Sequence, residues 1–156
     1  MNDLAPVTRL ILPGWHGSGP EHWQRLWSAH DPEAVVVEQD NWDEPDLSAW
    51  LRRLDGYIRR HERAQLVAHS LGVFLVLHYA VLHASDARQL IHSALLVAPG
   101  DADLHAPDLP AIAGFAPVPR RRLPFPELWC SAAMTLSQET HPKSLNCIGF
   151  FRRAAR

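Results

Sequence analysis

One serine, at a corner between a predicted strand and a predicted helix, is well placed to do chemistry. An apolar run ending at Ala68 predicts a buried strand, and apolar residues at helical spacing begin at Leu71. Small residues stand two positions before and after Ser70, namely Ala68 and Gly72, which leaves room for the helix to fold back past the corner. This pattern is typical of a nucleophile elbow, which presents a strained serine to a carbonyl carbon.

A serine hydroxyl attacks an ester efficiently only when a base accepts its proton and hydrogen-bond donors stabilise the oxyanion. The backbone N–H of Leu71 opens the predicted helix and points toward whatever Ser70 attacks. A second N–H can come from Trp15-His16, in the glycine-rich loop 14–19 that follows the first predicted strand. These residues predict acyl transfer through a serine, and we expect no cofactor.

The same loop and three histidines permit two other interpretations. The loop could cradle a phosphate, but it lacks the G-x-G-x-x-G spacing and the lysine of a P-loop. His16, His22 and His69 could bind a metal, but no H-x-x-x-H pattern or carboxylate cluster accompanies them on one element. We therefore expect neither site. We interpret His69 as structural, because adjacent side chains on a strand point to opposite faces.

The elements around these residues predict an α/β fold with a doubly wound parallel sheet. Apolar runs predict about five strands, which alternate with helices at 20–27, 47–58 and 71–84 and lie at 7–12, 34–38, 66–68, 95–98 and from 128 onward. A sheet order of 2-1-3-4-5 places the first strand beside the third. The loop after the first strand and Ser70 then face each other, at the position where such sheets bind ligands.

Composition indicates one ordinary globular domain. The chain has 156 residues, of which 47% are hydrophobic and 21% charged, and its net charge of −2 gives no reason to expect nucleic acid or an anionic membrane as a partner. The N-terminus shows no signal pattern and no apolar stretch is long enough to span a bilayer. With only Cys130 and Cys147, both late in the chain, we expect a reducing, cytoplasmic location.

The chain resembles a family of small α/β-hydrolase-like serine hydrolases that includes retinoblastoma-binding protein 9 and the bacterial YdeN-type proteins. The matching stretches together run from about residue 7 to residue 128, and they are Leu12 to Trp23, Glu38 to Pro45, Val67 to Gly72, Leu95 to Pro99 and Phe115 to Pro126. The resemblance implies that Ser70 is the nucleophile, that the backbone N–H groups of Trp15 and Leu71 form the oxyanion hole, and that a small-molecule ester is the substrate.

The family's other triad residues, an Asp and a His, are expected after residue 128, and the matching pattern is not found there. Residues 131–156 contain no Asp, and their only histidine, His141, follows Thr140 where the family has Gly. We therefore predict a hydrolase core at 1–128 and an aberrant tail at 129–156 that lacks the family's last strand and helix. Activity of this chain is expected to be impaired, since both triad partners are missing.

A shift of reading frame explains the aberrant tail. Read one nucleotide early, the codons from Trp129 to Leu136 are compatible with Val-x-Ser-Ser-(Asn/His/Asp)-Asp-Pro, which is the turn that the family carries after its fifth strand. The hypothesis is that the last residues are out of frame or truncated. The alternative is a family member with a genuinely different C-terminus, and sequencing the gene through the Leu128 codon decides between them.

A second class of function uses the same fold. In a non-catalytic binding module, the groove beside Ser70 would hold a peptide or small ligand without reacting with it. An enzyme is expected to lose its function on Ser70→Ala substitution, whereas a binding module is expected to tolerate this change.

Overall fold

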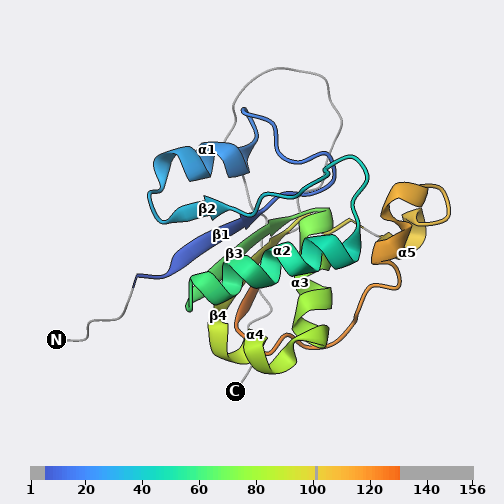
Figure 1. The fold of residues 1–156 in the computed structure, drawn as a ribbon. Helices are drawn as coiled ribbons and strands as arrows, with labels where there is room; N and C mark the ends of the chain where they lie inside the picture. Colours follow the sequence, from blue (N-terminus) through green and yellow to red (C-terminus); the bar gives the residue numbers. More distant parts are fainter. Residues whose placement is uncertain (1–5, 101, 131–156) are drawn as a thin grey trace.

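The computed structural model describes residues 6–100 and 102–130 (Figure 1). Five parallel strands form one sheet in the order β2-β1-β3-β4-β5, which confirms the predicted doubly wound α/β fold. The strands are β1 (Thr8–Leu12), β2 (Ala34–Val36), β3 (Ala64–His69), β4 (Ile91–Val97) and β5 (Glu127–Cys130). The prediction that the tail lacks the family's last strand and helix concerns residues beyond 130, and these lie outside the described residues.

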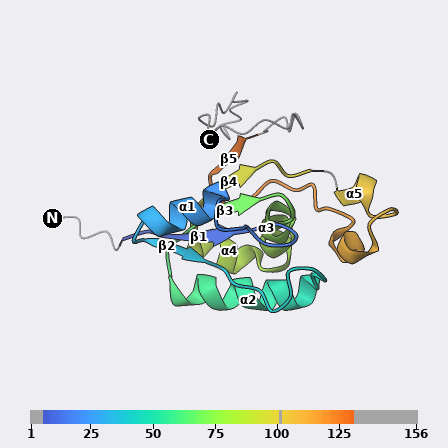
Figure 2. The ribbon, with the colours of Figure 1, turned by 90° about the horizontal axis from the view of Figure 1, so that it is seen from above.

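Helices cover both faces of the sheet, because right-handed crossovers change face where the strand order reverses direction. Helix α1 lies on one face, while α2, α3 and α4 lie on the other (Figure 2). The short α5 and the 3₁₀ helix η1 lie beyond the carboxyl ends of the strands (Figures 1 and 2). The helices are α1 (Trp23–His30), α2 (Leu47–Arg60), α3 (Leu71–Leu82), α4 (Ala84–Leu90), α5 (Ala102–His105) and η1 (Pro110–Phe115).

Two helices show how the sequence sets burial. The apolar positions of α2 repeat at helical spacing, so one stripe faces the core, and Trp50, Leu54 and Ile58 are almost fully buried. The Asp46 side chain caps this helix by accepting a hydrogen bond from the Ala49 N–H. Helix α3 is apolar all round, and every residue from 71 to 77 is buried. It is therefore the central helix on its face of the sheet.

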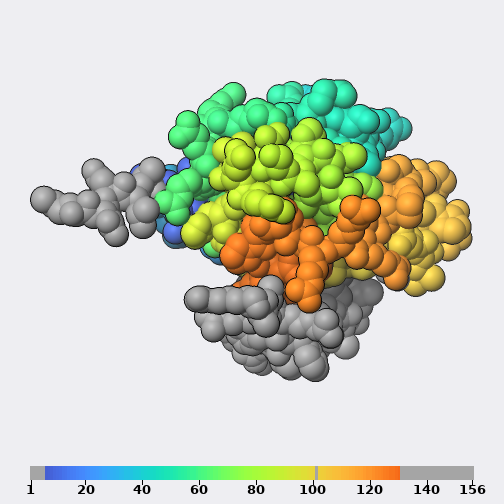
Figure 3. Space-filling model, turned by 90° about the horizontal axis from the view of Figure 1, so that it is seen from below, coloured from blue at the N-terminus to red at the C-terminus, as the bar shows by residue number. Residues whose placement is uncertain are grey.

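Several boundaries differ from those predicted. Helix α1 begins at Trp23, with His22 as its N-cap, rather than near Pro20. Strand β4 begins at Ile91, four residues earlier than the apolar run indicated. Helix α4 was missed because it buries only Ala87 and so has no apolar stripe. It packs beside the segment that leads into β5 (Figure 3). The four-residue α5 was also missed.

The described helices include none that is long and apolar enough to cross a membrane.

The buried core lies between α2 and α3 and the central strands, with the apolar residues of β1, β3 and β4 at its centre. Strand β5 pairs with β4 from Glu127 to Cys130 and forms the edge of the described sheet. This arrangement brings the loop after β1 and the corner after β3 to the same edge, because their strands are adjacent and parallel.

Candidate active site

Ser70 is the corner residue between β3 and α3, and its backbone has a conformation that residues with a side chain rarely adopt. Its φ is 53° and its ψ is −120°. The Ser70 N–H donates a 3.0 Å hydrogen bond to the carbonyl oxygen of Val97 in β4. A residue held at positive φ costs free energy and persists only where the surrounding structure enforces it. Here the packed strand and the packed helix on either side enforce it.

Two glycines bring the loop after β1 against this corner. A methyl group built on Gly14 would lie 2.9 Å from Cβ of Ser70 and 3.2 Å from the backbone nitrogen of Leu71. One built on Gly72 would lie 2.5 Å from the carbonyl oxygen of Leu12. Both contacts are too short for a real side chain. The close approach of backbone to backbone therefore depends on glycine at both positions.

Backbone N–H groups from both segments are free to bind an anion. The His16 N–H donates a 3.0 Å hydrogen bond to the carbonyl oxygen of Trp42. In the Trp15-His16 segment, the N–H of Trp15 therefore remains available to bind an anion. Leu71 is the first residue of α3, where backbone N–H groups have no partner within the helix. Across the described part of the chain, neither N–H has a hydrogen-bond partner.

The same three residues line one pocket. Ser70, Trp15 and Leu71 contribute to a cavity of about 170 Å³ that also reaches α5 and η1. Its remaining walls are mostly apolar and come from Phe74, Pro99, Gly100, Ala102, Leu109 and Ile112. His105 also lines it and is the one titratable side chain among these lining residues. Sequence analysis missed His105, since it lies in the proline-rich stretch whose conformation has no periodic signal.

Gln24 ties the glycine-rich loop to the sheet, and sequence analysis missed it too. The side chain is completely buried. Its Nε2 donates 3.0 Å hydrogen bonds to the carbonyl oxygens of Leu12 and Val67, and its Oε1 accepts a 2.8 Å bond from the Ser18 hydroxyl. A buried amide is stabilising only when its donors and acceptor are satisfied, as they are here. Gln24 therefore fixes the end of β1, the end of β3 and the loop relative to one another.

The loop carrying Trp15 has further support on its outer side. The indole N–H of Trp15 donates a 2.9 Å hydrogen bond to the carbonyl oxygen of Asp43, and the Trp15 ring stacks on His16 at 4.3 Å. His16 Nδ1 lies 2.8 Å from the Asp43 carboxylate. Inside the loop, Gly17 packs against the Trp42 ring at a φ of 71°. The segment between β2 and α2 thus braces the loop between β1 and α1.

The three histidines considered for a metal are not gathered into one site. His16 pairs with Asp43, whereas the rings of His22 and His69 lie 4.8 Å apart. His69 also meets the edge of Trp23, at 6.0 Å, so its side chain packs against α1 as strand alternation predicts. A cluster with suitable metal ligands elsewhere in the described chain, Asp55 with His83 and Asp86, already carries the guanidinium of Arg59 on both carboxylates.

Burial, together with the smaller effect of the nearby His22, lowers the pKa of His69 to about 4. The unfolded chain therefore binds this proton below a pH near 6.5, while the folded chain does not until about pH 4. We predict that the free energy of unfolding is highest above pH 6.5 and falls as the pH drops toward 4. Urea titrations across this range measure the slope.

A His69→Gln variant is expected to lose much of this slope, since the group that titrates differently in the two states is gone. His30→Gln is the matched control, because His30 is an exposed histidine at the end of α1. It should leave the slope as it is. A slope that survives in His69→Gln and disappears in His30→Gln contradicts the assignment.

Comparison with known proteins gives a family match and two structural neighbours. The model of a family described as serine hydrolase matches residues 9–139. No curated protein matches the chain. A protein described as a YdeN-like hydrolase from Pectobacterium atrosepticum superposes with a TM-score of 0.63 at 22% identity, over 79% of this chain and 61% of that one.

The second neighbour is the ydeN gene product of Bacillus subtilis, with a TM-score of 0.53 at 21% identity, over 76% of this chain and 62% of that one. At these identities the likeness concerns the fold. The chain spans about three fifths of the length of both neighbours. The similarity to YdeN-type proteins agrees with the family resemblance of the sequence, and the kinship with retinoblastoma-binding protein 9 stays a prediction.

Proposed function

The chain belongs to the serine hydrolase family, and from this membership we propose that Ser70 is the nucleophile of a hydrolase acting on small esters or amides. The observation that supports this most directly is the corner itself. Ser70 lines a pocket together with two residues, Trp15 and Leu71, whose backbone N–H groups have no partner in the described chain. We assign these two N–H groups as the oxyanion hole.

The proposed reaction follows from this geometry. The Ser70 oxygen bonds to the carbonyl carbon of the ester, and the carbonyl oxygen becomes an oxyanion that accepts hydrogen bonds from the Trp15 and Leu71 N–H groups. Collapse of this intermediate expels the alcohol and leaves an acyl-serine, which water then hydrolyses to the acid. Removing one such donor typically costs about 10²–10³ in rate. A base has to accept the serine proton in the first step and give it to the departing alkoxide. In the second step it accepts a proton from the attacking water and returns one to the serine oxygen.

No base for Ser70 is found among residues 6–100 and 102–130. In the described residues, no side chain is hydrogen-bonded to the Ser70 hydroxyl. Residues 131–156 offer only His141 and no Asp. We therefore propose that the 156-residue chain is an impaired enzyme whose C-terminal segment is read out of frame. A genuinely divergent C-terminus is the alternative.

Added imidazole can test Ser70 in this chain, because it supplies a base in solution. Turnover of p-nitrophenyl acetate is expected to be slow without imidazole. With imidazole it should exceed that of Ser70→Ala by about tenfold, as a positioned base itself contributes about 10²–10⁴. The Ser70→Ala sample under the same conditions subtracts hydrolysis by imidazole alone. Equal rates for the two proteins would argue against Ser70 as nucleophile.

Fast turnover without imidazole, abolished by Ser70→Ala, would support the nucleophile and overturn the proposed impairment. His105 would then be the first base to examine, by His105→Gln, since it lines the same pocket. The second candidate function is a binding module that uses this pocket without chemistry, which is favoured because no described side chain is hydrogen-bonded to the Ser70 hydroxyl. Ligand binding that survives Ser70→Ala, with no imidazole-dependent turnover, identifies that function.

A further inference from the structure

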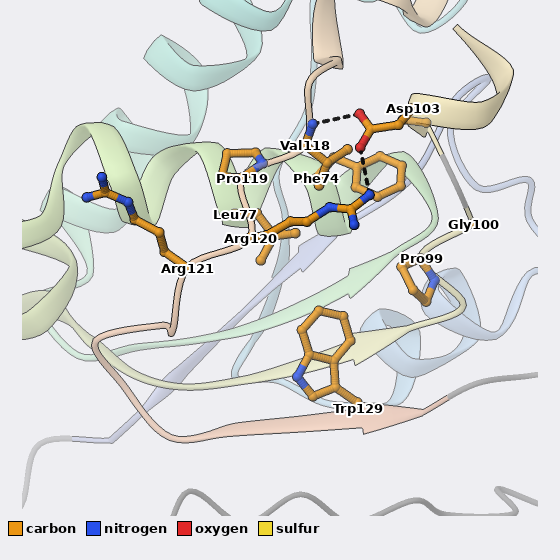
Figure 4. Close-up of a pocket in the computed structure, with 11 residues that line it drawn as sticks. Phe74, Leu77, Pro99, Gly100, Asp103, Val118, Pro119, Arg120, Arg121 and Trp129 are labelled. Atoms are coloured by element: carbon orange, nitrogen blue, oxygen red, sulfur yellow. Dashed lines mark hydrogen bonds and ion pairs between the residues drawn. The ribbon is translucent and has the colours of Figure 1, made fainter.

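A second pocket adjoins the one that contains Ser70. It has a volume of about 310 Å³ and lies between α3, the end of β4, the segment 118–121 and β5 (Figure 4). The two pockets have four lining residues in common, namely Phe74, Pro99, Gly100 and Ala102. A methyl group built on Gly100 would meet no atom within 4 Å, so the backbone at this junction borders open space. The second pocket is therefore a direct neighbour of the proposed reaction centre.

Size indicates that the two pockets act together. Pockets that hold small organic ligands typically enclose about 300–1,000 Å³. The Ser70 pocket, at about 170 Å³, is smaller than this range. Together with its neighbour it falls inside the range. A substrate too large for the Ser70 pocket can therefore extend into the second pocket.

The walls of the second pocket are largely apolar, and the charged residues among them are Asp103, Arg120 and Arg121. Phe74 and Leu77 of α3 form one side, and the Trp129 ring of β5 faces them across the cavity (Figure 4). The one carboxylate in the wall, Asp103, is already neutralised. It accepts a 2.8 Å hydrogen bond from the Val118 N–H and pairs with Arg120 at 3.2 Å. These contacts hold the pKa of Asp103 below its usual value. The Asp103 carboxylate is therefore paired with Arg120 at the rim of the pocket.

We propose that this second pocket, as it stands in the 156-residue chain, binds the apolar chain of the substrate, so that esters with a medium-length alkyl or an aryl group are accepted in preference to acetates. The inference rests on the proposed function, because the chain has to reach the pocket from an ester carbonyl held at Ser70. Leu77, which lines the second pocket and not the first, is the residue that sets the available chain length.

Binding of two carboxylates to the full chain tests this proposal without requiring turnover. Butyrate and octanoate carry the same carboxylate, which can accept hydrogen bonds from the Trp15 and Leu71 N–H groups, and they differ only in chain length. Octanoate is expected to bind about tenfold more tightly or better, because its added methylenes leave water. Calorimetric or NMR titrations measure both dissociation constants.

Leu77→Trp fills the second pocket and should reduce octanoate binding to the level of butyrate, with butyrate unchanged. Val118→Phe narrows the same pocket from a half-buried position and serves if Leu77→Trp does not fold. Val81→Trp, on the exposed side of α3, is the matched control and should retain the octanoate preference. Absence of the preference, or its survival in both pocket variants, overturns the proposal.

The two proposals fail separately. If imidazole-dependent turnover through Ser70 is observed but octanoate has no advantage over butyrate, the pocket inference is wrong and the function stands. If the octanoate preference and its loss in Leu77→Trp are observed without any Ser70-dependent turnover, the chain is a binding protein for apolar carboxylates and the hydrolase function is wrong.

Discussion

A gene with one nucleotide inserted at the Leu128 codon is expected to encode an esterase about 10⁴-fold or more as active as the 156-residue chain. The insertion restores, on the frameshift hypothesis, the Asp-Pro turn after β5 and the later Gly-His stretch that the family resemblance implies. Enzymes of this kind lose activity on this scale when their serine is left without its histidine, because the triad works as a unit. Turnover of p-nitrophenyl butyrate measures the gain.

The control for this experiment is the same insertion combined with Ser70→Ala, which should remove the gain entirely. The shifted frame must first encode the expected residues, and a stop codon soon after Leu128 or a frame without Asp and His contradicts the hypothesis. A restored tail that folds but does not raise turnover would mean that the oxyanion hole assigned to Trp15 and Leu71 is wrongly placed.

Replacing Gly72 by alanine should cost about 3 kcal/mol of the free energy of unfolding, at the upper end of what overpacking typically costs. The added methyl group would lie 2.5 Å from the carbonyl oxygen of Leu12 and 2.9 Å from that of Pro13. Both are backbone atoms at the end of β1, and they cannot rotate out of the way as the tip of a side chain can. Urea denaturation of the two proteins measures the difference.

Gly56→Ala is the matched control. Gly56 lies inside α2, and a methyl group built on it would meet no atom within 4 Å. Alanine restricts the unfolded chain and favours the helix, so this change should raise the free energy of unfolding by about 0.5–1 kcal/mol. An equal effect of both substitutions would mean that helix propensity, rather than the contact with β1, accounts for the result at Gly72.

Both predictions concern the close approach of two backbone segments, the start of α3 and the loop after β1. The proposed oxyanion hole takes one donor from the start of α3 and one from the loop after β1, so its width is set by how closely these backbones approach. Gly14 and Gly72 permit that approach, and Gln24 holds the ends of β1 and β3 together from below. Substitutions at these positions should therefore affect the site even though none of the three residues lines the Ser70 pocket.

The local periodicity of the sequence was sufficient to predict the strands, the stripe of α2 and the corner at Ser70. These features depend on residues that are neighbours in the chain, where apolar spacing and small residues express the geometry directly. The pairing of β1 with β3 followed from general rules of topology. The position of Ser70 opposite the glycine-rich loop was therefore predictable before any coordinates existed.

Tertiary structure alone decided how the site is held and what surrounds it. Gln24, His105 and the second pocket come from contacts between residues far apart in sequence, and α4 and α5 bury too few residues to leave a periodic signal. A polar side chain such as Gln24 looks like any surface residue until the fold surrounds it with carbonyl oxygens. The sequence by itself determined the proposed nucleophile and its place in the fold, whereas long-range packing decided the shape of the two pockets.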